Sequence, residues 1–80
     1  MEKFNDWLLV QHTHYVKGSR WHFLHLDDLD NYKDLIENDV HFYRISKGLP
    51  LIKKEDTFNF EGINIQPPVE LINYIKKHLS

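Results

Sequence analysis

The chain has 80 residues, with 12 acidic residues against 10 lysines and arginines and a formal net charge of −2. This length suits one domain near the lower size limit of unaided folding, and the absence of cysteine excludes disulfides and thiolate metal sites. The negative charge argues against broad nucleic-acid binding, in which a basic surface supplies most of the affinity. The apolar run at residues 7–10 is too short for a signal peptide or a membrane span, so we expect a soluble cytoplasmic protein without a membrane partner.

Residues 7–26 are expected to form a β-hairpin. Residues 7–16 are rich in β-forming side chains and predict a strand. Residues 17–20 contain Gly18, which can adopt positive φ, and predict a turn. Residues 21–26 then predict the second strand of the hairpin.

A helix is expected after this hairpin. Asp27 and Asp28 end the second strand and can cap the helix. Apolar residues at three- and four-residue spacing give the helix one apolar stripe, and it is expected to end near Asn38. The stripe consists of Leu29, Tyr32, Leu35 and Ile36.

The second half of the chain predicts further strands. Residues 40–46 give the clearest strand signal, and Lys47 with Gly48 turns the chain. Residues 49–54 predict a fourth strand, which Pro50 confines to an edge or to a strand start. Two short extended pieces, broken at Gly62, follow at residues 57–60 and 63–65.

A C-terminal helix completes the expected domain. Pro67 and Pro68 open it, because the first turn of a helix does not need their missing N–H groups. Its apolar face comprises Leu71, Ile72, Ile75, His78 and Leu79. The order β-β-α-β-β-(β)-α predicts one α+β domain over residues 1–80, with an antiparallel sheet and two helices packed on one face.

Five of the six histidines lie in the predicted strands: His12, His14, His22, His25 and His41. A two- or four-residue loop in the first hairpin would pair even positions with odd ones and place His12, His14 and His25 on one face. Three converging imidazoles can bind zinc and leave one coordination position open. These three histidines are therefore the candidate metal site, zinc is the one candidate cofactor, and Asp27 could act as a further ligand or orient a ring.

The hairpin register decides which histidines converge. A three-residue loop would shift the pairing by one and bring His22 beside His12 and His14, while His25 would move to the other face. Two imidazoles could also serve as acid and base in RNA cleavage, with Arg20 near the phosphate. Several half-buried histidines would alternatively form a pH-sensitive surface, or simply be hydrogen-bonded residues of the sheet.

Residues 27–39 carry six of the twelve acids of the chain and a single lysine. Acids in the first turn of a helix favour its dipole, but acids near its end oppose the dipole, which suggests an external role for the latter. With two aromatic residues of the third strand, these acids define the candidate partner-binding surface: Asp27, Asp30, Asp34, Glu37, Asp39, Phe42 and Tyr43. The alternative is an ordinary solvated helix face.

The sequence contains no phosphate-binding loop and no nucleophile motif. We therefore expect a non-enzymatic protein-binding module or small inhibitor that occludes a protein partner through the acidic helix and the aromatic sheet surface. A phage or mobile-element inhibitor, an immunity protein or an antitoxin would fit, and a second copy of the chain is an alternative partner. The competing hypotheses are a metal protein or ribonuclease-like enzyme using His12, His14 and His25, and a nucleic-acid-binding module.

Overall fold

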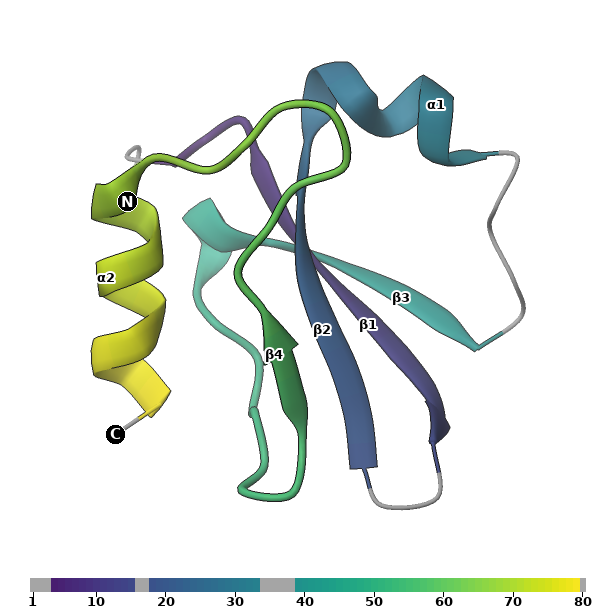
Figure 1. Cartoon of the computed structure of the whole chain (residues 1–80), viewed down its shortest axis with the longest axis vertical. Helices are drawn as coiled ribbons and strands as arrows, with labels where there is room; N and C mark the ends of the chain where they lie inside the picture. Colours follow the sequence, from purple (N-terminus) through teal and green to yellow (C-terminus); the bar gives the residue numbers. More distant parts are fainter. Residues whose placement is uncertain (1–3, 16–17, 34–38, 80) are drawn as a thin grey trace.

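The chain forms a four-stranded sheet and two α-helices in a computed structural model that describes residues 4–15, 18–33 and 39–79 (Figure 1). This small single domain agrees with the predicted α+β class. The strands are β1 (Trp7–Tyr15), β2 (Gly18–His25), β3 (Val40–Arg44) and β4 (Thr57–Asn59). The helices are α1 (Leu29–Lys33) and α2 (Val69–Leu79), and two single-turn 3-10 helices are η1 (Leu26–Asp28) and η2 (Ile45–Lys47). No helix in the described ranges is long and apolar enough to cross a membrane.

The sheet is mixed rather than purely antiparallel as predicted. Its strand order is β3-β1-β2-β4, with β1 antiparallel to both β2 and β3. β4 lies parallel to β2 at the opposite edge (Figure 1). Parallel neighbours need a long crossover, and the whole stretch from α1 to residue 56 supplies it.

The predicted fourth strand at residues 49–54 is wrong, because β4 forms later, within the short extended piece predicted at 57–60. Leu51 is exposed in the irregular segment that precedes β4. Residues 63–65 form a bend instead of an extended piece. The N–H groups of Asn64 and Ile65 donate to the Asp28 carboxylate at 3.0 and 2.8 Å, so they are taken up by a side chain rather than a strand.

A β-bulge sets the register of the first hairpin. Tyr15 pairs with Gly18, so the connection is only residues 16 and 17, which lie outside the described part together with the predicted end of the first strand. Between this pair and the pair His12–Arg20, β1 has two residues where β2 has only Ser19. Such an extra residue shifts the pairing by one. Even positions of β1 therefore pair with even positions of β2.

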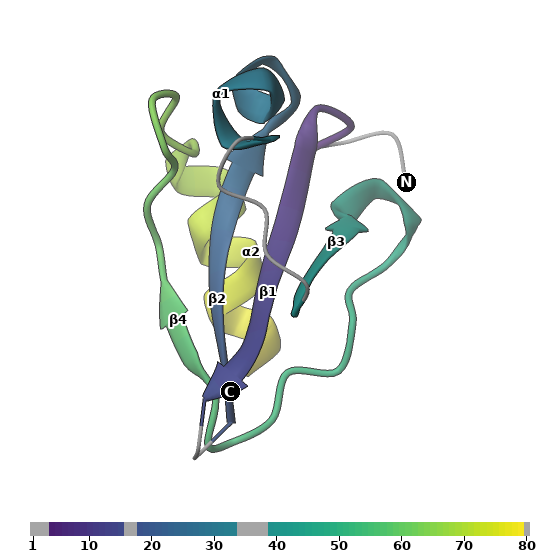
Figure 2. The ribbon, with the colours of Figure 1, turned by 90° about the vertical axis from the view of Figure 1, so that its right-hand side faces the viewer.

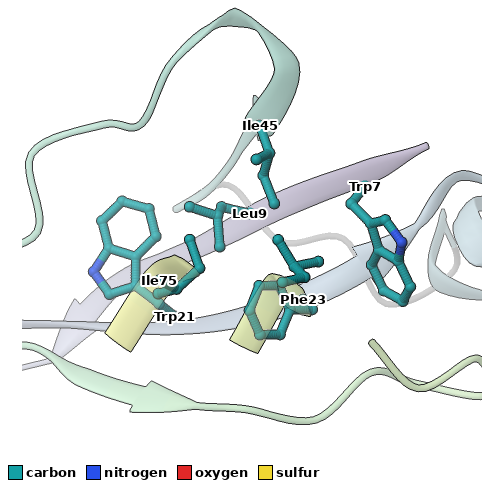
Figure 3. Packing of buried hydrophobic residues seen from close by; sticks show 7 residues of the cluster. Trp7, Leu9, Trp21, Phe23, Ile45 and Ile75 are labelled. Atoms are coloured by element: carbon teal, nitrogen blue, oxygen red, sulfur yellow. The ribbon is translucent and has the colours of Figure 1, made fainter. Parts of the chain in front are cut away.

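The two helices pack on opposite faces of the sheet, which corrects the predicted one-face arrangement. On one face, where α2 lies against the sheet (Figure 2), Leu71 and Ile75 join the main core cluster. Figure 3 shows Ile75 within this cluster. Its fully or nearly fully buried members are Trp7, Leu9, Trp21, Phe23, Ile45, Leu71 and Ile75. On the other face, Tyr32 of α1 covers a smaller cluster. That cluster also contains Leu8, Val10 and Leu24.

The two helices pack on opposite faces because of the apolar run at residues 7–10. Alternate side chains of a strand point to opposite faces, so four consecutive apolar residues make both faces of β1 apolar. All four are buried, Leu9 and Val10 completely. One helix cannot cover both faces, and α1 and α2 divide them.

Helix α2 begins directly after the proline pair, as predicted, and the N–H of Leu71 donates to the carbonyl of Pro68 at 3.0 Å. Leu71 and Ile75 are buried, Ile72 is half-buried, and His78 and Leu79 are exposed. The apolar contact of α2 therefore ends one turn earlier than the sequence pattern predicts.

Asp56 connects the irregular segment before β4 to the sheet. Its carboxylate accepts hydrogen bonds from the N–H of Ser19 at 2.8 Å, from Trp21 Nε1 at 2.9 Å and from the N–H of Lys53 at 2.9 Å. Burial raises the pKa of Asp56, but these three donors and the charge of Lys53 outweigh burial and hold the pKa below its usual value. Gly18 is needed beside this carboxylate, because it has a φ of +132° and an added Cβ would lie 2.7 Å from Asp56 Oδ1.

Replacement of Leu9 by alanine should lower the free energy of unfolding by about 2–5 kcal/mol, because it leaves a cavity in the main core. Leu51→Ala removes the same atoms from an exposed position and should change the free energy of unfolding by less than about 0.5 kcal/mol. Urea denaturation of both variants measures the difference. Equal effects of the two substitutions would contradict the described core.

Asp56 should make folding stability fall in acid. Because its pKa is lower in the folded protein than the unfolded value of about 3.9, its contribution is complete above that value and is lost as the pH falls through the folded pKa. Asp56→Asn should remove this part of the pH dependence and cost about 1–3 kcal/mol at pH 7. Urea denaturation between pH 2.5 and 7 tests this, with the neighbouring exposed acid changed in Glu55→Gln as the control. A pH profile unchanged by Asp56→Asn would refute the role of this carboxylate.

Candidate functional site

Two histidines and a tyrosine converge on the face that α1 covers. His12 Nε2 lies 2.9 Å from His22 Nε2 and 2.9 Å from Tyr32 Oη, and Tyr32 Oη lies 3.4 Å from His22 Nε2. We call these three residues the His–His–Tyr cluster. Its histidines are half-buried and its tyrosine is buried. Three separate elements, β1, β2 and α1, therefore bring three polar atoms to one point.

The local sequence explains this convergence. The bulge pairs His12 with Arg20 and Val10 with His22, so the two histidines lie diagonally across the hairpin on one face. The chain then returns over that face through η1 and α1, where Tyr32 packs against the Leu8–Val10–Leu24 cluster. The tyrosine ring fills apolar space while its hydroxyl reaches the histidines.

Hydrogen bonds fix the protonation of His22. Its Nδ1 lies 3.1 Å from the carbonyl oxygen of Phe23, which can only accept, so Nδ1 carries the proton. Burial lowers the pKa of His22, and the nearby His12 and Arg20 act in the same direction against the opposing Phe23 hydrogen bond. A neutral His22 with a protonated Nδ1 has a bare lone pair on Nε2. That lone pair faces the other two atoms of the cluster.

The prediction that His12, His14 and His25 converge is wrong for His12 and His25, whose side chains the structure describes. His25 pairs with Trp7 and lies on the opposite face from His12, with its ring 4.8 Å from the Trp7 ring. The bulge causes this difference, because it shifts the strand pairing by one residue and so brings His22 beside His12. The side chain of His14 lies outside the described part.

His25 has a structural role at the start of η1. Its Nδ1 accepts a hydrogen bond from the N–H of Asp27 at 3.0 Å, so it caps the 3-10 turn. The carboxylate of Asp27 is 3.7 Å from the same nitrogen, but a nitrogen that accepts from an N–H carries no proton for an ion pair. Across the described residues, no group of three or more His, Cys, Asp or Glu side chains is arranged to hold a metal ion.

The predicted partner surface is divided by the fold. Asp27, Asp30 and Asp39 are exposed, whereas Asp34 and Glu37 lie outside the described residues. Phe42 and Tyr43 point to opposite faces of β3: Phe42 packs edge-on to Tyr32, and Tyr43 packs on Trp21 and donates to Gln11 Oε1 at 3.0 Å. The two aromatic residues therefore cannot form one flat contact surface.

Sequence reasoning missed the buried acid of the acidic segment. Asp28 is 2% exposed and holds the bend at residues 64 and 65. The N–H of Ile65 and then groups of Asn64 lower the pKa of Asp28, against the effect of burial. Tyr32 was assigned to an apolar stripe, and its hydroxyl gave no signal. His22 appeared only in the alternative register.

The geometry of the cluster limits its chemistry. An acid–base pair for RNA cleavage needs two imidazoles on either side of a phosphate. Here the two Nε2 atoms contact each other at 2.9 Å, and the rings stack with centroids 5.0 Å apart. The arrangement suits the sharing of a proton or of a small cation between the three atoms, not the flanking of a phosphodiester.

Comparison with known proteins adds no functional information: no protein-family model, no curated protein and no solved structure matches this chain.

The cluster predicts an uncommon tautomer. In metal-free protein above pH 7, long-range ¹H–¹⁵N spectra should show His22 protonated at Nδ1 and bare at Nε2, because the carbonyl of Phe23 accepts from Nδ1. His41, which is exposed on β3, is the reference histidine in the same spectra. Protonation of His22 at Nε2 alone would contradict the described hydrogen bonding.

Proposed function

We propose that this chain is a non-enzymatic protein-binding module that acts by occluding its partner, and that the outer edge of β3 is where the partner docks. The observation that carries this proposal is the position of β3 at one end of the strand order, with β1 as its one strand neighbour among the described residues. An edge strand offers backbone donors and acceptors to a strand of another protein.

The β1–β3 register identifies the backbone groups on that edge. Thr13 donates its N–H to the carbonyl of Asp39 at 3.0 Å, in line with the pairs Gln11–His41 and Leu9–Tyr43. In an antiparallel ladder, alternate residues bond to the same neighbour, and the residues between them face the other way. The outward-facing residues are therefore Val40, Phe42 and Arg44.

Side chains near this edge offer additional contacts. A hollow of about 520 Å³ lies at the end of β3, between the strand and the segment after η2. It is lined by Phe42, Tyr43, Arg44, Lys47, Gly48, Leu49 and Pro50. An added strand places every second side chain on one face, and a hollow beside the edge can receive one of them.

Charge favours a basic partner. The exposed carboxylates of Asp27, Asp30 and Asp39 lie in the segment that leads from β2 into β3. Like charges repel and a basic surface is attracted, so such acids raise the rate of encounter with a basic partner more than they raise affinity. A small acidic domain that adds a strand to a basic protein could block that protein's own ligand, as an immunity protein, an antitoxin or a phage inhibitor does.

The strand-addition proposal can be tested with a matched pair of variants. Val40→Pro removes an outward N–H at the first residue of β3, where proline is tolerated. Val40→Ala truncates the side chain further than Val40→Pro does and keeps the N–H, so it controls for the loss of side-chain packing. Each purified, tagged variant is used to capture proteins from nuclease-treated lysate of the source cell, with mass spectrometry as the readout.

We expect one stoichiometric protein to bind the parent chain and Val40→Ala, and to be lost with Val40→Pro. The double variant Asp27→Lys/Asp30→Lys should slow association about tenfold at low salt, and Glu61→Lys/Glu55→Lys, at exposed positions outside the acidic segment, is its charge-matched control. Equal capture by Val40→Pro and Val40→Ala would refute docking at β3. Capture that depends on nucleic acid would favour the nucleic-acid-binding hypothesis instead.

A further inference from the structure

We propose that the His–His–Tyr cluster is a binding site for a divalent transition-metal ion, with His12 Nε2, His22 Nε2 and Tyr32 Oη as ligands and zinc as the natural candidate. This set differs from the histidines that the sequence suggested, since it replaces His14 and His25 by His22 and Tyr32. The proposal does not depend on docking at β3.

The distances between the three donor atoms are close to those in a metal site. Zinc binds imidazole nitrogen and oxygen ligands at about 2.0–2.2 Å in tetrahedral geometry, which places ligand atoms about 3.3–3.6 Å from each other. The three separations in the cluster are 2.9, 2.9 and 3.4 Å. Rotations of the side chains that open two contacts by about 0.5 Å would fit an ion.

The other ring nitrogen of His22, Nδ1, already has a hydrogen-bond partner. Metal-bound histidines almost always donate their other ring N–H to a carbonyl or a carboxylate, which fixes the tautomer and the ring orientation. The Nδ1 of His22 donates to the carbonyl of Phe23 at 3.1 Å, so its Nε2 lone pair is available without a change of tautomer. The carbonyl of Phe23, the next residue of β2, therefore orients the His22 ring for metal binding.

The three atoms of the cluster hold few exchangeable protons between them. His22 Nε2 is a bare acceptor, so the triangle contains at most one N–H from neutral His12 and one O–H from Tyr32. A bound metal ion would displace these protons: the Tyr32 O–H proton would leave to solvent, and His12 would keep its proton on Nδ1. A cation at the centre would interact favourably with all three lone pairs at once.

The donor types select the kind of metal. Two imidazole nitrogens and a phenolic oxygen suit zinc, copper or nickel, whereas magnesium and calcium prefer sites made of oxygen ligands. Three protein ligands leave one tetrahedral position for water or another small ligand.

The test is metal binding by tag-free protein, without a histidine tag that would itself bind the probe. Zinc chloride is titrated into metal-free protein and followed by isothermal titration calorimetry, and retained zinc is measured after gel filtration. The parent chain should bind one zinc ion per molecule. A folded parent chain that binds no zinc would overturn the proposal.

Matched variants locate the site. His12→Ala and His22→Ala should each weaken zinc binding at least about 100-fold, because removing a ligand costs at least as much as removing a supporting group. Tyr32→Phe should weaken it about tenfold, since it keeps the packing and loses one oxygen. His25→Ala changes a half-buried histidine of the same strand on the opposite face and should bind like the parent. Wild-type affinity in His22→Ala, or equal losses in His25→Ala and His22→Ala, would refute this ligand set.

A spectroscopic measurement on the unmodified chain covers the case in which a histidine variant fails to fold. Zinc should shift the Nε2 resonances of His12 and His22 in long-range ¹H–¹⁵N spectra and leave His41 and His78 unchanged. Cobalt substituted for zinc should give the intense visible bands of a tetrahedral site. Zinc-induced shifts confined to other histidines would overturn the proposal.

Discussion

Burial of both faces of the β1–β2 hairpin is the constraint on which the rest of the structure depends. Trp7, Leu8, Leu9 and Val10 follow one another in β1, and each is almost or completely excluded from solvent. Because neighbouring side chains of a strand point to opposite sides, each face of this hairpin requires its own cover. Helix α2 covers one face and Tyr32 of α1 helps to cover the other, which gives an 80-residue chain two apolar clusters on one thin sheet (Figure 2).

Two buried or half-buried carboxylates hold the irregular segments against this hairpin. Asp28 accepts from the backbone of residues 64 and 65, and Asp56 accepts from β2 and from its own loop. Both acids are therefore satisfied inside the protein, where an unpaired carboxylate would be costly. The exposed acids of residues 27–39 are a separate population, and a role in recognition is proposed only for those.

Sequence periodicity predicted the parts of the fold that local pattern controls. The first hairpin, the strand near residues 40–46 and the helix after the proline pair are confirmed within a few residues. The parallel placement of β4 was not predictable, because it depends on contacts between distant segments rather than on local composition. The division of the helices between two faces could have been inferred from the apolar run at residues 7–10, which leaves neither face of β1 polar.

The candidate site was predicted only in part, for a physical reason. Whether His22 or His25 meets His12 depends on a one-residue bulge, and a register shift of one residue exchanges the faces of a strand. Propensity and spacing do not encode such a bulge. Tyr32 was recognised as an apolar packing residue, but the contact of its hydroxyl with His12 depends on how α1 sits on the sheet.

The central claim is that the bulged register brings His12 and His22 together, and cross-strand nuclear Overhauser effects test it most directly. Because odd residues of β1 bond to β3, their partners in β2 form the close, non-hydrogen-bonded pairs. The account predicts strong Hα–Hα effects between Leu9 and Phe23 and between Gln11 and Trp21. Effects that connect Leu9 with Leu24 or Gln11 with His22 instead would show the unbulged register and contradict the account.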